Sequence, residues 1–199
     1  RFGHMAPMMM DHVFLFIEPE GPEIDALRRL GLAETYRRAH PGQGTANVCF
    51  AFDNLFLELL WVTSEAEARS PAIARMRLWE RSQWLSQGSC PFGVAVRGDL
   101  ASAGVPTWDY LPPYLAQVLP VGVGIPVAIA SDDPALPMVF VSPGNESPVH
   151  WPEERRGGLQ QAAGFGTVLS VELGLPTRAA TASLLSTLAS TNPPLRVTQ

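Results

Sequence analysis

Lysine is absent from this sequence, and all 14 basic residues are arginine. The absence excludes a Schiff-base lysine, a phosphate-loop lysine and a lysine general base. The 19 acidic residues give a net charge of −5, and no basic stripe is present, which argues against a DNA or RNA partner. No run of about 18 uninterrupted apolar residues occurs either, so we expect no membrane partner.

Cysteine is nearly as scarce. Cys49 and Cys90 are too few for a disulfide framework. Free buried thiols are ordinary in a reducing compartment, so we expect a cytoplasmic protein. Residues 1–10 contain Gly3-His4-Met5, which is typical of a cloning scar, and we interpret this segment as a tag remnant or disordered lead.

Histidine is the third residue type in short supply. Outside the leading segment the sequence has His12, His40 and His150. A metal site built from a larger cluster of histidines is therefore excluded. Mixed sites of histidine and carboxylate are the kind that this sequence permits.

Residues 11–62 show the order strand, helix and three strands. A short apolar run ends in a proline-rich turn, and apolar residues then recur at helical spacing until Gly31. A polar strand, a Pro-Gly turn and two strands joined by Asp53-Asn54 complete the unit. The strands are predicted at residues 11–17, 32–40, 45–52 and 55–62, and the helix at residues 22–30.

A weaker copy of this order follows in residues 90–143, after a connecting helix in residues 63–89. Strands are predicted at residues 91–97, 126–130 and 138–141. Residues 144–199 are interpreted as a long polar loop, a strand, a helix and a frayed end. A tandem unit changes the fold prediction, so we expect one structural domain of class α+β, with two βαβββ modules and a C-terminal β-α extension.

Arginines gather in the connecting segment, where they alternate with glutamates. This alternation favours a solvated helix face over an anion site. Arg97, at the end of the first strand of the second module, is expected to be a surface residue. The four clustered arginines are Arg69, Arg75, Arg77 and Arg81.

Glu58 lies inside the apolar run from Leu55 to Trp61. An unpaired buried charge is costly, so this carboxylate is either a ligand or general base facing a cavity, or it faces solvent or an arginine. His40, at the mouth of the Pro-Gly-Gln-Gly turn, is a substrate contact or general acid–base, or an exposed turn residue. Asn47 either positions a polar substrate group or satisfies the backbone of its strand.

Three stretches together resemble the glyoxalase-like branch of the vicinal oxygen chelate superfamily, which also includes bleomycin-resistance proteins and dioxygenases. They are Asp11-His12-Val13, His40 to Asn47, and Leu57-Glu58-Leu59-Leu60. The resemblance implies that the strands of the two modules curl into a cup-shaped mixed sheet around a shared cavity. It also leads us to expect a bacterial protein, and it leaves a homodimer open.

In metal-using members of this superfamily, the ligands come from the first and last strands of each module. By this resemblance His12 and Glu58 match the ligands of the first module. The second module departs from the pattern, because Cys90-Pro91-Phe92 stands at its first strand and Met138 to Ser142 contains no carboxylate. Cys90 and His150 are possible substitutes or structural residues. We therefore expect at most a weakly bound divalent metal.

The resemblance leads to two hypotheses about function. The first is a metal-assisted lyase or isomerase that acts on a small oxygenated metabolite, with Glu58 and His40 as its catalytic residues. The second is a metal-free protein of the bleomycin-resistance kind that binds or sequesters a small molecule. Asn47 and the aromatic residues Phe52, Trp61 and Trp108 are expected to contact the ligand.

Overall fold

The computed structural model describes residues 8–180, 182–192 and 194–199. Its first half is a strand, a helix and three further strands, as the sequence predicts. The first strand begins at Met9, two residues before the predicted start, and Met10 is buried. The elements are β1 (Met9–Phe16), α1 (Pro22–Arg29), β2 (Tyr36–His40), β3 (Thr45–Ala51) and β4 (Phe56–Val62).

The second half repeats the strands but not the helix. Turns occupy the described residues 98–106, where the first module has α1. One strand, β6, lies within the proline-rich stretch and was not predicted, because prolines on both sides of it read as a loop. The strands are β5 (Phe92–Arg97), β6 (Thr107–Tyr110), β7 (Ile125–Ala128) and β8 (Met138–Val141).

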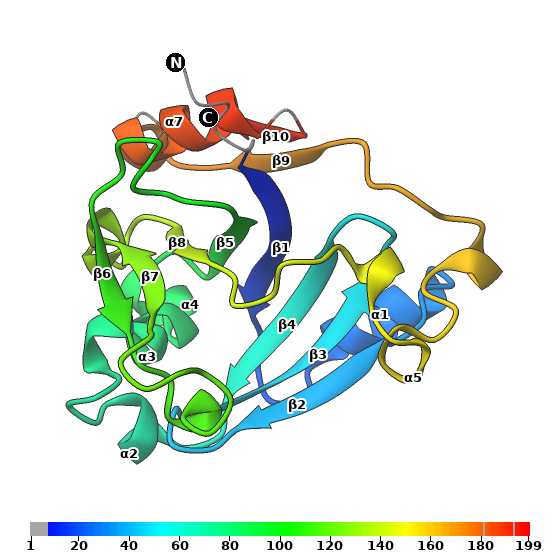
Figure 1. The fold of residues 1–199 in the computed structure, drawn as a ribbon, viewed down its shortest axis with the longest axis horizontal. Coiled ribbons are helices and arrows are strands. Elements are labelled where there is room, and N and C mark those ends of the chain that lie inside the picture. The colour runs from blue at the N-terminus through cyan, green and yellow to red at the C-terminus, as the bar shows by residue number, and fades with distance from the viewer. Residues whose placement is uncertain (1–7, 181, 193) are drawn as a thin grey trace.

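All eight strands form a single mixed sheet with the order β2-β3-β4-β1-β5-β8-β7-β6. The two central strands β1 and β5 are antiparallel, and each pairs in parallel with the last strand of its own module, β4 or β8. Figure 1 shows the two halves curling away from β1 on either side. The predicted fold class, α+β with two modules in a cup-shaped mixed sheet, is confirmed.

Strand alternation decides which side chains face the inside of the cup. Successive residues of a strand point to opposite faces. On β4, Glu58 and Leu60 therefore face inward, whereas Leu59 packs on the outer face with Ile24 of α1. Gly93 on β5 leaves room for the ring of Phe14, which a Cβ at that position would meet.

The outer faces of the two modules are covered by different elements. Helix α1 covers the first through the cluster that contains Ile24 and Trp61. The second is covered by the C-terminal extension, in which Leu185 and Leu188 pack with Val94 and Val139. The extension comprises β9 (Val171–Gly174), α6 (Thr177–Ala180), α7 (Ser183–Thr191) and β10 (Leu195–Thr198).

Two segments differ from their predicted structure. Residues 63–89 form several short helices rather than one, and Arg77, with a φ of 56°, separates two of them. The predicted frayed end contains β10, which pairs in parallel with β9. The short helices are α2 (Glu65–Ala68), η1 (Ala74–Met76), α3 (Leu78–Ser82) and α4 (Trp84–Gln87).

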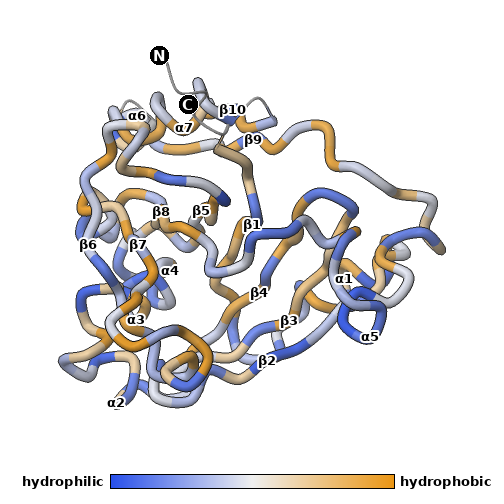
Figure 2. The backbone as a smooth tube through the Cα atoms, viewed as in Figure 1, coloured by the Kyte–Doolittle hydropathy of each residue, from blue (hydrophilic) through white to orange (hydrophobic). Residues whose placement is uncertain are grey.

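The remaining short helices lie in loops. They are η2 (Pro113–Leu115), η3 (Ile129–Asp132), η4 (Pro148–His150), α5 (Glu153–Arg156) and η5 (Gln161–Ala163). In Figure 2 β2 and α5 are largely hydrophilic, whereas β7 is largely hydrophobic. Within the described residues, no helix combines the length and the apolar character that a membrane crossing requires.

Candidate functional site

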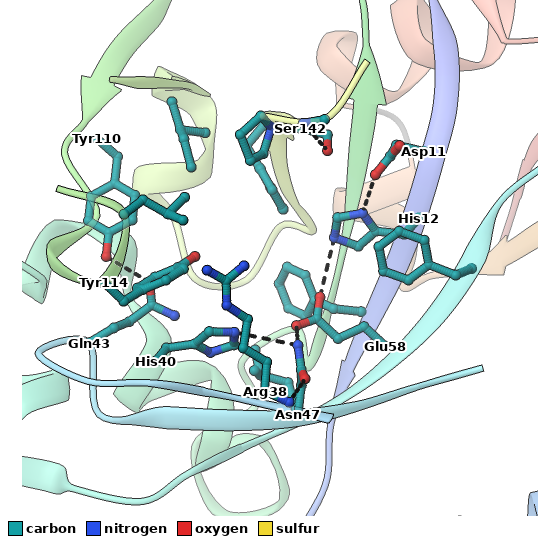
Figure 3. Close-up of a pocket in the computed structure, with 18 of the residues that line it drawn as sticks. Asp11, His12, Arg38, His40, Gln43, Asn47, Glu58, Tyr110, Tyr114 and Ser142 are labelled. Carbon is teal, nitrogen blue, oxygen red and sulfur yellow. Dashed lines mark hydrogen bonds and ion pairs between the residues drawn. The ribbon is translucent and has the colours of Figure 1, made fainter. Parts of the chain in front are cut away.

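A cavity of about 340 Å³ lies inside the cup, between the two modules. This volume is in the range of small-molecule pockets. Strands β1 to β4 contribute its polar side, and β6 to β8 with the η2 loop contribute most of its apolar side. Residues 142–155 add a third wall that includes Trp151 and Arg155. Figure 3 shows the labelled side chains converging on this space.

His12 and Glu58 form the centre of the polar side. The Nε2 atom of His12 is 3.2 Å from Oε2 of Glu58, and both side chains are largely buried. The ring of His12 stacks on Phe56 with centroids 4.2 Å apart, and the edge of Phe140 completes its surroundings. Strands β1 and β4 are parallel neighbours, which is why residues 46 positions apart meet here.

Asp11 fixes the other nitrogen of His12. Its Oδ2 lies 2.7 Å from Nδ1 of His12, although adjacent residues of a regular strand point to opposite faces. A bulge between Met10 and His12 explains the contact, because Asp11 is the extra residue in the pairing with β5. Arg97 donates to Oδ1 of Asp11 at 3.0 Å. The prediction that Arg97 is a surface residue is therefore wrong.

These contacts shift the pKa values of all three groups. Burial by itself lowers the pKa of His12, but hydrogen bonds to Asp11 and Glu58 and their charges outweigh it and raise the pKa to about 9. Burial raises the pKa of Glu58 and of Asp11, yet His12 more than compensates and both pKa values are lowered. The site therefore holds an imidazolium between two carboxylates at neutral pH.

Asn47 links this pair to the backbone of β2. Its Nδ2 donates to Oε1 of Glu58 at 2.7 Å, and its Oδ1 accepts the backbone N–H of Arg38 at 3.0 Å. His40 lies close by, with its Nε2 3.5 Å from Asn47 Nδ2. Burial lowers the pKa of His40; the charge of Glu58 opposes this and the charge of Arg38 adds to it, and the net pKa is lowered, so its imidazole is neutral at neutral pH.

His40 continues a chain of side-chain contacts into the second module. Its Nδ1 lies 2.8 Å from Oγ1 of Thr45, which also accepts from Nε2 of Gln43. Gln43 Oε1 in turn accepts from the hydroxyl of Tyr110 on β6 at 2.7 Å. Since Asn47 donates to Nε2 of His40, the proton of this imidazole is on Nδ1. The turn that positions these side chains depends on Gly44. At a φ of 75°, a Cβ on Gly44 would collide with the carbonyl oxygen of Ser64.

The structure thus brings four of the predicted site residues to one cavity: His12, His40, Asn47 and Glu58. The three predicted aromatic contacts do not line it. Trp61 faces the opposite side of the sheet under α1, because it is an odd number of residues from Glu58. Phe52 lies on the outer side near Phe165, and Trp108 is stacked under Arg75.

Cys90 and His150, the possible substitutes for the metal ligands missing from the second module, also lie away from the cavity. His150 is exposed and contacts Ser147, although its neighbour Trp151 lines the cavity. Cys90 is buried beside the carbonyl of Phe92, so it behaves as a structural thiol. Neither is among the residues that line the cavity.

Several cavity residues were missed from the sequence. Asp11 was read as part of a strand start, and only the bulge aims it at His12. Arg38, Tyr114 and Trp151 come from a polar strand, a proline-rich stretch and a loop, none of which shows a periodic pattern. Tyr110 was missed together with β6, the strand that it ends, and the structure shows it to be buried.

The donor set does not fit a resident metal ion. Within the described residues, no group of three or more His, Cys, Asp or Glu side chains is placed to hold one. Glu58 and His12 are already engaged with each other, and the cavity-facing residues of β8 are Met138 and Phe140. A firmly held ion usually takes about three or four protein ligands. These residues by themselves therefore do not complete the ligand set of a firmly held ion.

Comparison with known proteins gives one family match and several structural likenesses. Residues 10–107 match the family model described as a glyoxalase-like domain. No curated protein sequence matches the chain. The solved structures include a Streptomyces coelicolor methylmalonyl-CoA epimerase in complex with 2-nitronate-propionyl-CoA. It is 14% identical, has a TM-score of 0.44, and the match covers 70% of this chain and 100% of that one.

A hypothetical protein from Staphylococcus aureus is also 14% identical. Its TM-score is 0.48, and the match covers 92% of this chain and 76% of that one. At these values neither likeness carries an inference about substrate. From the family match, residues 10–107 of the chain belong to the glyoxalase-like domains of the glyoxalase, or vicinal oxygen chelate, superfamily.

Proposed function

We propose that the cavity binds a small oxygenated metabolite and that Glu58 transfers a proton at a carbon next to its carbonyl group, as an isomerase or lyase does. One observation carries this proposal. The buried carboxylate of Glu58 and the buried imidazole of His12 line the same cavity 3.2 Å apart. Asn47 hydrogen-bonds the carboxylate, and Asp11 hydrogen-bonds the imidazole. Such positioned acid–base pairs are what proton transfer at carbon requires.

Glu58 is the base in this scheme. Its carboxylate takes the proton from the carbon, and the electron pair of the C–H bond moves through the carbon skeleton to the carbonyl oxygen. His12 presents its Nε2–H to that oxygen and stabilises the negative charge of the enolate. The 3.2 Å separation exceeds the roughly 2.7–2.9 Å of a fully formed charge-assisted hydrogen bond, which leaves this donor able to serve a ligand oxygen.

Asp11 and Asn47 act as positioning residues. Asp11 accepts from Nδ1 of His12 and so directs Nε2 toward the cavity. Asn47 holds one oxygen of Glu58 and leaves the second oxygen beside His12. Delivery of a proton to the opposite face of the same carbon inverts its configuration and gives isomerisation, whereas departure of a group, with its bonding electrons, from the neighbouring carbon gives elimination.

His40 is the second group that can exchange a proton with a ligand. It is neutral, and its Nε2 faces the cavity near Asn47 while the ring packs against Tyr114. A neutral imidazole next to an imidazolium gives the cavity one base and one acid of the same chemical type. We propose that His40 receives or returns a proton on the side of the ligand away from His12.

A binding or sequestering protein is the second candidate. The observation that favours it is the apolar inner face of the second module, where Tyr114, Leu115 and Phe140 line the cavity without an ionisable carboxylate or imidazole. Such a wall holds a ligand by contact and burial. In this case His12 and Glu58 would bind a polar group of the ligand without moving a proton.

Hydrogen–deuterium exchange in heavy water separates the two. Pyruvate, levulinate and their amides each carry protons next to a carbonyl, and NMR follows the loss of these signals. We expect the wild-type protein to accelerate exchange with at least one of them, and Glu58→Gln to lower the rate about 100-fold or more. Glu65→Gln, at an exposed ion pair with Arg69, is the matched control and should change nothing. Binding without exchange would support sequestration instead.

A further inference from the structure

Two arginines on the cavity wall have no carboxylate partner within the described part of the chain. Arg38 of β2 and Arg155 of α5 both line the cavity, and neither takes part in any of the ion pairs of the described residues. Their neighbour Arg37, by contrast, pairs with Glu20 and Glu34 on the other side of β2. The cavity therefore presents positive charge that this part of the chain leaves unmatched.

The acidic groups at the bottom of the cavity are already matched. Asp11 pairs with His12 and Arg97, and Glu58 pairs with His12, so two anions and two cations form a closed set. Glu146 is the remaining carboxylate along the wall. It is exposed and forms no ion pair with either cavity arginine.

Aromatic rings hold both guanidinium groups in place. Arg38 lies over Tyr114 at 5.1 Å from the ring centroid, and Figure 3 shows its guanidinium pointing into the cavity beside that ring. Arg155 lies over Trp151 at 3.9 Å and over Tyr36 at 4.9 Å. Stacking on a ring leaves the N–H edge of the Arg38 guanidinium free, and that edge matches the two oxygens of a carboxylate. One nitrogen of Arg155 also donates to the hydroxyl of Tyr36 at 3.4 Å.

Arg38 is also tied to the acid–base pair. Its backbone N–H donates to Oδ1 of Asn47, and Nδ2 of Asn47 donates to Glu58. Strands β2 and β4 are separated by one strand, which places their backbones about 10 Å apart. Because the arginine side chain reaches inward, a ligand of only a few carbon atoms spans the distance from its guanidinium to His12 and Glu58.

We propose that the natural ligand is a small organic acid whose carboxylate binds the N–H edge of Arg38, with Arg155 as a second, outer contact. The placement of its carbonyl group against His12 and Glu58 rests on the proposed function, whereas the carboxylate site does not. The ligand is thereby held at both ends, which fixes the carbon next to the carbonyl beside Glu58.

Acid and amide pairs test the carboxylate site directly. Pyruvate and levulinate differ from pyruvamide and levulinamide by one negative charge and little in shape. Binding is measured by NMR and by the fluorescence of Trp151 and the other tryptophans. We expect the acids to bind at least about tenfold more tightly than the amides, and Arg38→Gln to remove that preference. Arg37→Gln, one residue away with its charge directed at Glu20 and Glu34, is the matched control and should keep it.

The outcomes separate this inference from the proposed function. Equal binding of acids and amides, no binding of either acid at millimolar concentration, or an equal loss in both arginine variants would overturn the carboxylate site. If deuterium exchange depends on Glu58 but is equally fast for acids and amides, the proposed function is supported and the carboxylate site is not. A charge preference that depends on Arg38, with no exchange, would support the carboxylate site and remove the proton-transfer role.

Discussion

The two modules share a strand topology but differ on their inner faces. In the first module, His12, Asn47 and Glu58 point into the cavity and are joined by hydrogen bonds. In the second, the corresponding wall is made of Met138 and Phe140 on β8 and of residues from the η2 loop. The same strand arrangement therefore carries a wall of titratable and polar side chains in the first module and an apolar wall in the second. Such asymmetry gives a bound ligand one preferred orientation.

The modules differ equally in what covers their outer faces. The first carries its own helix, α1, between its first two strands. The second has turns there and depends on elements outside itself. The C-terminal extension covers its sheet, and Arg81 of α3 holds the loops before β5 and β8. The second module is thus the half whose folding depends on the rest of the chain.

The largest effect is expected from Arg81→Met. The Arg81 side chain is fully buried and donates to the carbonyl oxygens of Cys90, Ser131 and Leu136, among others. Burial lowers its pKa to about 10. Loss of these donors leaves several buried carbonyl groups unsatisfied, and we expect unfolding to become easier by about 3–5 kcal/mol in a urea titration.

Arg69→Met is the control for this change. Arg69 is exposed and pairs with Glu65 one helical turn away, so its replacement should cost less than about 0.5 kcal/mol. Equal destabilisation by both variants would show that the second module does not depend on the buried arginine.

A second prediction compares one polar residue from each wall. Asn47→Ala removes a donor from the buried carboxylate of Glu58 and an acceptor from the N–H of Arg38. We expect it to cost about 1.5–3 kcal/mol and to slow any proton exchange. Ser142→Ala, on the β8 side, removes a 3.3 Å contact to the N–H of Gly144 and a hydrogen bond to Asp11, which keeps its ion pairs with His12 and Arg97. It should therefore cost less than Asn47→Ala, about 1 kcal/mol. Thermal unfolding of both variants measures the difference, and a reversed order would contradict the assignment of the polar wall to the first module.

The pH dependence of stability should report the first module. The pKa of His12 is raised to about 9, so its contribution is fully present below its ordinary value of 6.5 and is lost as the pH rises through 9. The pKa values of Asp11 and Glu58 are lowered, so their contributions are present above 3.8 and 4.5 and are lost in more acidic solution. Between pH 6.5 and about 9, we expect the free energy of unfolding of the wild-type protein to fall more steeply than that of His12→Asn.

NMR titration gives the same information at one residue. The imidazole signal of His12 should still be that of the protonated form at neutral pH, whereas that of His40 should be neutral. Glu58→Gln should lower the pKa of His12, because one of its two carboxylate partners is lost. An unshifted His12 in the wild-type protein would contradict the closed charge network.

The smallest effect is expected from metal ions. We propose that any divalent ion binds weakly, since His12 and Glu58 are the two available ligands and already pair with each other. Stabilisation grows as the logarithm of ligand concentration over dissociation constant, about 0.4 kcal/mol when the two are equal and about 1.4 kcal/mol at a tenfold excess. Nickel or zinc should therefore raise the melting temperature only slightly. His12→Ala and Glu58→Ala should lose that shift, and stoichiometric metal that survives chelation would disprove the proposal.

Much of the fold could be predicted from the sequence because local patterns carried it. The βαβββ order of the first module followed from one apolar run, one helical period and two turn signals. The second module was harder, since β6 is a strand of four residues between prolines. The C-terminal strand β10 was missed for a different reason. It is stabilised by its pairing with β9 rather than by a pattern of its own.

The sequence by itself determined that a carboxylate, Glu58, lies in an apolar strand and that few histidines are available as its partners. Only the tertiary structure decided which partner it has and which aromatic rings share its cavity. Alternation along β4 sends Trp61 to the outer face, while a one-residue bulge in β1 turns Asp11 toward His12. Arg38 and Tyr114 come together across the cup from segments without periodic pattern. Side-chain direction in a strand depends on register, and register is set by pairing with strands far away in the sequence.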